Sequence, residues 1–418
     1  MKMKLWMAFL SLVFATQLTA QRNCSSYTYL RQQLQNDPSL QVRLDAVEIF
    51  SRQHAGTRNN FSRTGETSLV IKIPVVVHIL YHQPNENITD AQVNSQIEAL
   101  NRCFRRLNAD TVNTPAAFRP FATDCEIEFK LATSDPRKRN TSGITRKYTP
   151  VTQWKADDKM KFSAEMGDDA WDPGSYLNIW VCNLDRVMGY SSVTGGTAGK
   201  DGVAIGFNVF GTINSMAGFD KGKTAVHEVG HWLNLKHLWG DANCGDDFVD
   251  DTPKQSGYNI ECPSGIRISC GNSPLGDMYM NYMDFTSDAC MNIFTKGQKA
   301  RMRALFEPGG LRNSILYSTG LNAPLIFETP VPEESPKWLH PQLFPNPVTT
   351  EMTLDLAYDI RWIGKMITVI NLQGQAIIQL TISSKYQKID VSKLKPGLYF
   401  LEAKKDDGES YKMKFIKL

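Results

Sequence analysis

The stretch TAVHEVGHWLNLKHLWG, Thr224–Gly240, decides how the rest of the chain is interpreted. It holds three of the seven histidines, His227, His231 and His237, together with Glu228. Residues four apart share one face of an α-helix, so His227 and His231 can present ring nitrogens to one ion with Glu228 beside them. An uninterrupted helix would carry His237 away from that face. The stretch therefore predicts a sharp turn at Asn234, a residue type that tolerates positive φ.

A zinc ion with catalytic function suits these side chains. Zinc in hydrolases takes three protein ligands and keeps one position open for water. An HExxH pair occurs often by chance, but a third histidine at this offset makes an accident improbable. We expect His227, His231 and His237 to bind zinc and Glu228 to act on the bound water. The remaining histidines are interpreted as ordinary solvated or hydrogen-bonded residues: His54, His78, His82 and His340.

Length and composition indicate an exported protein of more than one unit. A chain of 418 residues is too long for one ordinary core. Its net charge of +3 comes from interspersed charges, which does not favour nucleic acid or an anionic membrane as partner. Lys2 and Lys4 precede the apolar run LWMAFLSLVFA, the pattern of a secretory signal cleaved after Ala20. No later run is long enough to span a membrane, so we expect a secreted mature chain.

Composition shifts divide the chain into five segments. Residues 1–20 are the signal peptide, and the polar, helix-prone residues 21–58 are a detachable pro-segment. Residues 59–320 form the catalytic domain. The proline-rich residues 321–340 form a linker, and residues 341–418 alternate apolar and polar residues as in a small all-β sandwich.

Within the catalytic domain, strand-like and helical patterns are mixed. LVIKIPVVVHILY, CEIEFKLA, YLNIWVCNL and VAIGFNVFG predict strands. TDAQVNSQIEALNRCFRRLN predicts a helix that opens on a Thr89…Gln92 capping box, with an apolar face made of Val93, Ile97, Leu100, Phe104 and Leu107. An irregular, cysteine-bearing region follows the histidine cluster. The fold class expected is α+β, followed by the sandwich.

Export makes disulfides plausible among the eight cysteines. Cys244, Cys262, Cys270 and Cys290 lie in one loop-rich region and predict two bridges, whose connectivity the spacing leaves open. Cys103 and Cys182 lie in helical and strand-like runs and are expected to be buried free thiols.

At this point the sequence resembles a known family. HExxHxxGxxH followed by a methionine turn is the metzincin signature, with Asn234 here in place of the glycine and NYMDF, containing Met283, as the turn. HEVGHWLNLKHLWGDANCGDDFVDDTP, NYMDFTSDACMNIFTKGQKARM and the four clustered cysteines resemble the pappalysin family, in its mirolysin and ulilysin branch. The resemblance covers about residues 60–310.

The resemblance implies a metzincin-type catalytic domain and a role for each motif residue. His227, His231 and His237 would bind zinc, and Glu228 would be the general base that polarises the zinc-bound water. Met283 would form the apolar floor beneath the metal. The family's disulfides correspond to Cys244–Cys270 and Cys262–Cys290.

Further family features fall on the irregular region. The carboxylate at the bottom of the pocket for the residue after the scissile bond corresponds to Asp288, which implies cleavage on the amino side of Arg, or of Lys. Calcium in the acidic loop GDDFVDDTP implies Asp247 and Thr252 as ligands, with a plain solvated turn as the alternative. One departure stands out: Phe285 occupies a position that is often an oxyanion-stabilising tyrosine, so Tyr282 or a backbone group must substitute, or turnover is slower.

Two further resemblances concern latency and export. In related zymogens a cysteine in an Arg-x-Cys stretch binds the zinc, and QRNCSS places Cys24 in that position. A preference for a following arginine would make Thr57–Arg58 a self-cleavage site. The C-terminal module, with LFPNPVTTEMTLDL and GLYFLEA, resembles the sorting domains of type IX secretion cargo. A carbohydrate-binding or adhesion module is the alternative.

The sequence therefore predicts a secreted, calcium-dependent zinc endopeptidase, made as a zymogen, that cleaves proteins or peptides before Arg or Lys. The type IX secretion machinery would be its partner during export. Two alternatives stay open. One is a catalytically weak binding or adhesion protein that retains the zinc site, and Phe285 is the residue that favours it. The other is a peptidase with an apolar specificity pocket, which Asp288 argues against.

Overall fold

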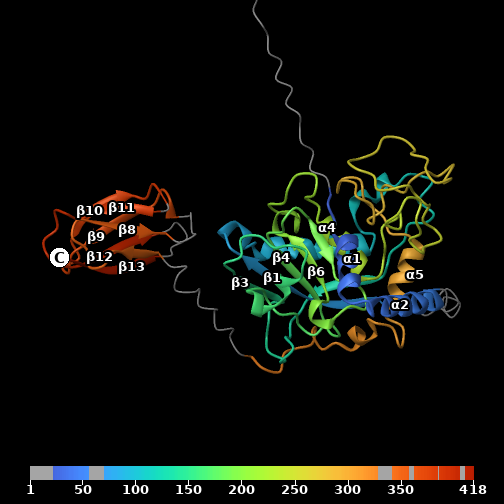
Figure 1. The fold of residues 1–418 in the computed structure, drawn as a ribbon, viewed down its shortest axis with the longest axis horizontal. Coiled ribbons are helices and arrows are strands. Elements are labelled where there is room, and N and C mark those ends of the chain that lie inside the picture. The colour runs from blue at the N-terminus through green and yellow to red at the C-terminus, as the bar shows by residue number, and fades with distance from the viewer. Residues whose placement is uncertain (1–21, 56–69, 328–340, 357–361, 385, 405–409) are drawn as a thin grey trace, which may run out of the picture.

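The computed structural model describes residues 22–55, 70–327, 341–356, 362–384, 386–404 and 410–418. Figure 1 shows a larger body that contains all of the α-helices and a smaller one made of strands. The predicted signal peptide, the Thr57–Arg58 site and most of the predicted linker lie outside the described residues. Residues 321–327 are described, and Leu325 and Ile326 donate backbone hydrogen bonds to Lys138, so attachment to the larger body extends past residue 320.

A mixed sheet forms the centre of the larger body. Its order is β2-β1-β4-β6-β5, with β3 also pairing with β1, and all of these pairings are parallel except that of β5 with β6. β1 is buried almost throughout, which explains its near-continuous apolar sequence. The strands are β1 (Ile71–Tyr81), β2 (Ile127–Leu131), β3 (Ile144–Tyr148), β4 (Leu177–Cys182), β5 (Gly189–Ser191) and β6 (Val203–Gly206).

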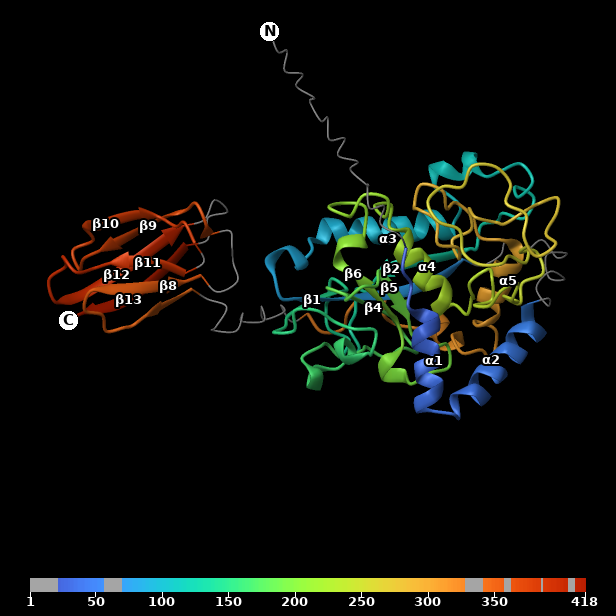
Figure 2. The same cartoon turned by 45° about the horizontal axis from the view of Figure 1, so that its top comes forward.

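Helices α3 (Asp90–Phe104) and α4 (Lys223–Trp232) share the main apolar core with the sheet (Figure 2). Thr89 caps α3 by accepting a hydrogen bond from the Gln92 N–H, as predicted. The reciprocal half of the predicted capping box, a bond from the Thr89 N–H to the Gln92 side chain, is not formed; the Gln92 amide NH2 donates to the carbonyls of Phe207 and Phe210. The prediction that Leu107 belongs to the apolar face is also wrong, because the helix ends at Phe104 and Leu107 is exposed.

Residues 233–295, all of them described, connect α4 to α5 (Lys296–Ala304) through turns and isolated bridges. This is the irregular region that the sequence predicts. Disulfides join Cys244 to Cys270 and Cys262 to Cys290, which is the pairing that the family resemblance implies. Cys103 and Cys182 are free and buried, as expected, and so is Cys125. Short 3-10 helices lie at Pro84–Glu86, Ala109–Asn113, Lys159–Lys161, Ser163–Glu165, Ala198–Lys200, Phe207–Val209 and Asn313–Tyr317.

The predicted pro-segment packs against this body. We call residues 22–55 the leader; it contains α1 (Ser26–Asn36) and α2 (Leu40–Ala55), drawn in blue in Figure 1. Tyr29 is 2% exposed and its hydroxyl donates to Asp158 at 2.7 Å. The Asp158 carboxylate is also paired with the fully buried Lys161 at 2.9 Å. Burial and the Asp158 charge raise the pKa of Tyr29, so the phenol stays neutral and donates.

The smaller body is an antiparallel β structure, as predicted. Four strands pair in the order β10-β9-β12-β13 and three in the order β11-β8-β7, and both sheets contribute to one apolar core that contains Trp362 and Phe415. The strands are β7 (Gln342–Phe344), β8 (Glu351–Asp355), β9 (Met366–Ile370), β10 (Ala376–Thr381), β11 (Tyr386–Asp390), β12 (Gly397–Lys404) and β13 (Ser410–Lys417).

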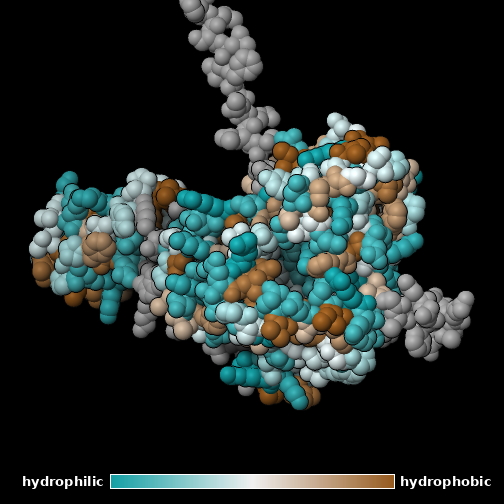
Figure 3. Space-filling model, turned by 45° about the vertical axis from the view of Figure 1, so that its right-hand side comes forward, coloured by the Kyte–Doolittle hydropathy of each residue, from teal (hydrophilic) through white to brown (hydrophobic). Residues whose placement is uncertain are grey.

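Within the described ranges no helix has the length and apolar character needed to cross a bilayer. On the face drawn in Figure 3, hydrophobic side chains form several small groups separated by hydrophilic ones.

The edge strand β2 depends on one side chain from α3. The Phe129 N–H donates to Asn101 Oδ1 at 2.7 Å, and Asn101 Nδ2 donates to the Phe129 carbonyl at 2.9 Å. Asn101→Ala would leave both backbone groups unpaired, so we expect it to lower the free energy of unfolding by about 2 kcal/mol. Urea unfolding followed by tryptophan fluorescence measures this. Asn94→Ala, on the exposed face of the same helix, should change stability by less than about 0.5 kcal/mol; equal effects would contradict the assignment.

Candidate metal centre and adjoining pocket

The three histidines of the motif meet at one point. His231 Nε2 lies 3.1 Å from His227 Nε2 and 3.0 Å from His237 Nε2. Asn234 makes this possible: α4 ends at Trp232, and Asn234 has a φ of 69°, as the sequence predicts. The Leu235 N–H then bonds back to the Gly230 carbonyl at 2.9 Å, which closes the helix and returns the chain toward its own axis.

The second nitrogen of each ring is held by an acceptor. His227 Nδ1 lies 2.7 Å from the Tyr282 carbonyl, and His231 Nδ1 lies 2.9 Å from the Leu235 carbonyl. His237 Nδ1 lies 2.5 Å from Asp241 Oδ1. Carbonyl and carboxylate oxygens only accept, so each Nδ1 carries the proton. The lone pairs of the three Nε2 atoms therefore face one another.

Such an arrangement fits a zinc ion. Three bare nitrogens at about 3 Å repel each other unless a cation lies between them. Zn–N bonds of about 2.0–2.1 Å in a tetrahedral site place two ligand nitrogens about 3.3 Å apart, close to the observed spacing. Hydrogen bonds from the far nitrogen to carbonyl or carboxylate are also the usual second contacts of zinc-binding histidines. Among the described residues, the one group with suitable metal ligands joins these histidines to Cys24.

Burial keeps the imidazoles of His227 and His231 neutral. It lowers the pKa of His231 to about 3 and, with the neighbouring rings, lowers that of His227 well below its ordinary value. Asp241 is the opposite case: burial opposes its charge, but the bond to His237 brings its pKa below the ordinary value. Neutral rings with a charged acceptor are the state that a divalent cation requires.

Glu228 lies beside the histidines, in contact with the leader. Its Oε2 accepts from the Ser26 hydroxyl at 2.9 Å and from the Cys24 thiol at 3.5 Å. Burial raises the pKa of Glu228 to about 7, against the lowering effect of these hydrogen bonds. Cys24 Sγ lies within 4.8 Å of the three ligand nitrogens, so the structure brings the predicted latency residue to the metal centre. Burial also raises the pKa of this thiol when no cation is present.

Met283 is fully buried beneath α4. Gly230, between the two helical histidines, leaves room for it: a Cβ on Gly230 would lie 2.5 Å from Met283 Sδ. The sequence analysis does not name Gly230 as a functional residue, although its position inside the HExxH motif could have identified it.

Asp288 is fully buried beside the start of α4. Its Oδ2 accepts from the N–H groups of Lys221 and Lys223 at the start of α4, at 2.9 and 3.2 Å. Its Oδ1 faces the guanidinium of Arg22, at 2.5 Å from Nη2. Arg22 also donates to Thr224 Oγ1 at 3.0 Å, and its guanidinium lies 5.2 Å from the Phe219 ring centre. The leader thus places an arginine against the carboxylate to which the family resemblance assigns arginine recognition.

Phe285 packs on the metal ligands, with ring centres 4.9 Å from His237 and 5.6 Å from His227. Tyr282 does not offer its hydroxyl to this site, because its side chain packs against Phe294 and its hydroxyl is buried near Cys103 without a hydrogen-bond partner among the described residues. The proposed substitution by Tyr282 is therefore unsupported.

The predicted calcium ligands lie together but bond to each other. Thr252 Oγ1 donates to Asp247 at 2.8 Å, and burial raises the pKa of Asp247 to about 7. No group of three or more His, Cys, Asp or Glu ligands forms around them in the described part of the chain. Calcium binding here stays a prediction.

Comparison with known proteins now identifies the family. Residues 161–307 match the model described as pregnancy-associated plasma protein-A, a peptidase family. An extracellular metalloprotease of Pyricularia oryzae is 45% identical over 144 residues, 32% of this chain and half of that protein. One from Verticillium alfalfae is 31% identical over 274 residues, 62% of this chain and 83% of that protein. This chain belongs to that family.

It is therefore a secreted zinc metallopeptidase of the pappalysin family, as the sequence predicts. Among solved structures, a promirolysin mutant from Tannerella forsythia is 44% identical, with a TM-score of 0.65, and the match covers 71% of this chain and 97% of that one. The α+β, metzincin-type fold is thereby confirmed. Residues 342–418 match a secretion system C-terminal sorting domain, which agrees with export.

The space left by Gly230 can be tested directly. Gly230→Ala should push Met283 out of its place beneath the histidines, and so lower zinc affinity and thermal stability. Zinc content after dialysis against a weak chelator, and the Tm, measure both effects. Gly257→Ala is the matched control, because nothing lies within 4 Å of a Cβ at that position. Unchanged zinc retention in Gly230→Ala would refute the role given to this glycine.

Proposed function

We propose that this protein is an endopeptidase, made as a zymogen, that cleaves protein chains on the amino side of arginine, and of lysine more weakly. The observation that carries the proposal is the position of the leader, with Arg22 against Asp288 and Cys24 at the three histidines. A segment that fills the pocket and reaches the metal centre together is what a substrate-like inhibitor requires.

His227, His231 and His237 would hold the zinc through Nε2. When bound, the ion supplies a Lewis acid that activates a water molecule and polarises the scissile carbonyl. Glu228 takes the proton of the attacking water and delivers it to the leaving amine. The Nδ1 contacts of the histidines keep the three rings oriented throughout.

The pocket supports a preference for arginine over lysine. Asp288 offers one free oxygen, while Thr224 and the carbonyl of Thr286 accept from other guanidinium nitrogens. A planar guanidinium can satisfy all three acceptors and still lie against the Phe219 ring. An ammonium at the end of a flexible chain cannot match this spacing as well.

Asp288→Asn tests the specificity. It keeps an oxygen for the backbone of α4 and removes the charge, so kcat/KM for a peptide with arginine after the cut should fall about tenfold to a hundredfold. A peptide with leucine there should be unaffected. Asp169→Asn, the same change at an exposed position outside the described sites, is the control. An equal loss on both peptides would contradict the specificity.

Latency would rest on Cys24 and the residues around it. Its thiolate would bind the zinc in the position needed by water, while Ser26 occupies the Glu228 carboxylate. The leader is held there by backbone pairing to β5, where the Ser25 N–H donates to the Gly189 carbonyl at 3.1 Å. Release of residues 21–58 would free the pocket, the metal and the base together.

Cys24→Ser tests the latency. A hydroxyl is a far poorer zinc ligand than a thiolate, so the uncut variant should cleave an arginine peptide on the order of tenfold faster than the uncut natural chain. Initial rates are taken while gels show the leader still attached. Ser25→Ala is the neighbouring control, since its backbone N–H, which pairs with β5, is unchanged. If the uncut Cys24→Ser variant still fails to cleave the arginine peptide, the role of Cys24 in latency is contradicted.

Three further assignments belong to this proposal. The segment limits 1–20, 21–58, 59–320, 321–340 and 341–418 describe its processing, and the last of these segments would engage the type IX secretion machinery. Protein or peptide chains would be its substrates. The second candidate is a weak binding or adhesion protein, and only Phe285 favours it. The three histidines and Glu228 argue against it, because together they form a complete catalytic arrangement.

A further inference from the structure

The second leader helix binds the larger body at a place separate from the metal centre. Both Glu48 carboxylate oxygens accept from Arg301 on α5, at 3.0 and 2.5 Å. Arg301 Nε in turn donates to the Asn234 carbonyl at 2.6 Å. Burial opposes the charge on Glu48, but Arg301 and Arg52 bring its pKa below the ordinary value, so the pair is ionic.

Asn234 makes a second contact with the same helix. Its Nδ2 donates to Ser51 Oγ at 3.1 Å, and Ser51 is fully buried. Glycine is the residue that the metzincin signature places here, and it would satisfy the turn. Only a side chain can reach Ser51. The departure from the signature therefore has a counterpart on the leader.

An aromatic ring completes this contact area. Lys236 Nζ lies 3.8 Å and the Arg52 guanidinium 4.4 Å from the centre of the Phe248 ring. On the same helix Val47 packs against the main apolar core. Three side chains of α2 therefore have fitting partners on the larger body. Glu48 pairs with a basic residue, Ser51 accepts a hydrogen bond and Val47 packs on apolar side chains.

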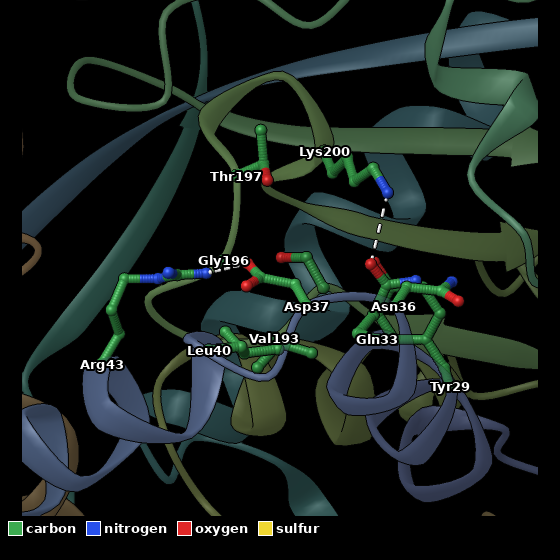
Figure 4. A pocket seen from close by; sticks show the side chains of 11 residues that line it. Tyr29, Gln33, Asn36, Asp37, Leu40, Arg43, Val193, Gly196, Thr197 and Lys200 are labelled. Atoms are coloured by element: carbon green, nitrogen blue, oxygen red, sulfur yellow. Dashed lines mark hydrogen bonds and ion pairs between the residues drawn. The ribbon is translucent and has the colours of Figure 1, made fainter.

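The two leader contacts are separated by a cavity of about 240 Å³ between the leader helices and the loop around Val193–Lys200 (Figure 4). Polar contacts cross it, from Lys200 to Gln33 at 3.2 Å and from Arg43 to the Gly195 carbonyl at 3.0 Å. A cavity thus lies between the part of the leader at the metal centre and the part that contacts Arg301.

We propose that the surface made of Asn234, Lys236, Phe248 and Arg301, which we call the leader exosite, binds the leader on its own. The excised leader is its partner, recognised through a helix that presents Glu48 and Ser51. It follows that a cut in residues 56–69 leaves the leader bound and the enzyme silent until the leader itself is degraded. This inference rests on the proposed latency.

The test uses the full chain with a site for a sequence-specific protease placed in residues 56–69. After that cut, gel filtration measures retention of the leader, in a Glu228→Ala background to prevent self-digestion. The active chain is assayed on an arginine peptide. Glu48→Gln and Ser51→Ala lie in the leader, so they leave the mature enzyme unchanged. Asp45→Asn, the same charge change at an exposed position of α2, is the control.

We expect the cut natural chain and cut Asp45→Asn to keep the leader and stay silent. Cut Glu48→Gln should release the leader at least about tenfold faster, with activity appearing in step, and Ser51→Ala should show a smaller effect in the same direction. Immediate separation and full activity of the cut natural chain would overturn the exosite, as would equal release by Asp45→Asn and Glu48→Gln. Activity of the uncut chain would instead refute the latency, while retention in the Glu228→Ala chain still decides the exosite.

Discussion

The active centre depends on holding three imidazole lone pairs against one another in a buried place. Without a cation this arrangement is repulsive, so the protein must fix each ring from behind. It does so with two backbone carbonyls and one carboxylate, from Tyr282, Leu235 and Asp241. These acceptors lie in turns and loops, because the carbonyls inside a helix or sheet are already used. The irregular region between α4 and α5 is therefore a requirement of the metal centre, and its two disulfides constrain a segment that has little regular structure of its own.

Asp288 also contributes to two parts of the site. One of its oxygens binds the first N–H groups of α4, the helix that carries His227 and His231, and the other faces Arg22. The carboxylate that would read the substrate thus also stabilises the start of the ligand-bearing helix. Removal of the whole Asp288 side chain would therefore disturb the start of α4 as well, whereas an asparagine keeps an oxygen that the helix can use.

The sequence predicted those features that depend on local periodicity or on a residue's own backbone preference. The helical face of His227 and His231, the turn at Asn234 and the buried strand β1 are of this kind. It could not predict the acceptors of Tyr282 and Leu235, since every residue has a carbonyl, although Asp241 was visible four residues after His237. The reciprocal capping bond is absent, and the Gln92 side chain is oriented instead by two carbonyls distant in sequence, which accept from its NH2 group. The sequence of the leader predicted that it is helical, but its polar composition gave no sign that Tyr29 would be buried against Asp158.

The edge strands β2 and β5 of the central sheet are covered by different parts of the chain. At β2 the Asn101 side chain covers the outer backbone groups permanently. At β5 the cover is the leader itself, through the bridge between Cys24 and Gly189. If the leader is removed, as we propose, β5 would be left with a short unpaired edge, and such an edge can pair with an extended polypeptide, including another copy of the same chain. On this proposal the timing of leader removal would bear on solubility as well as on proteolysis.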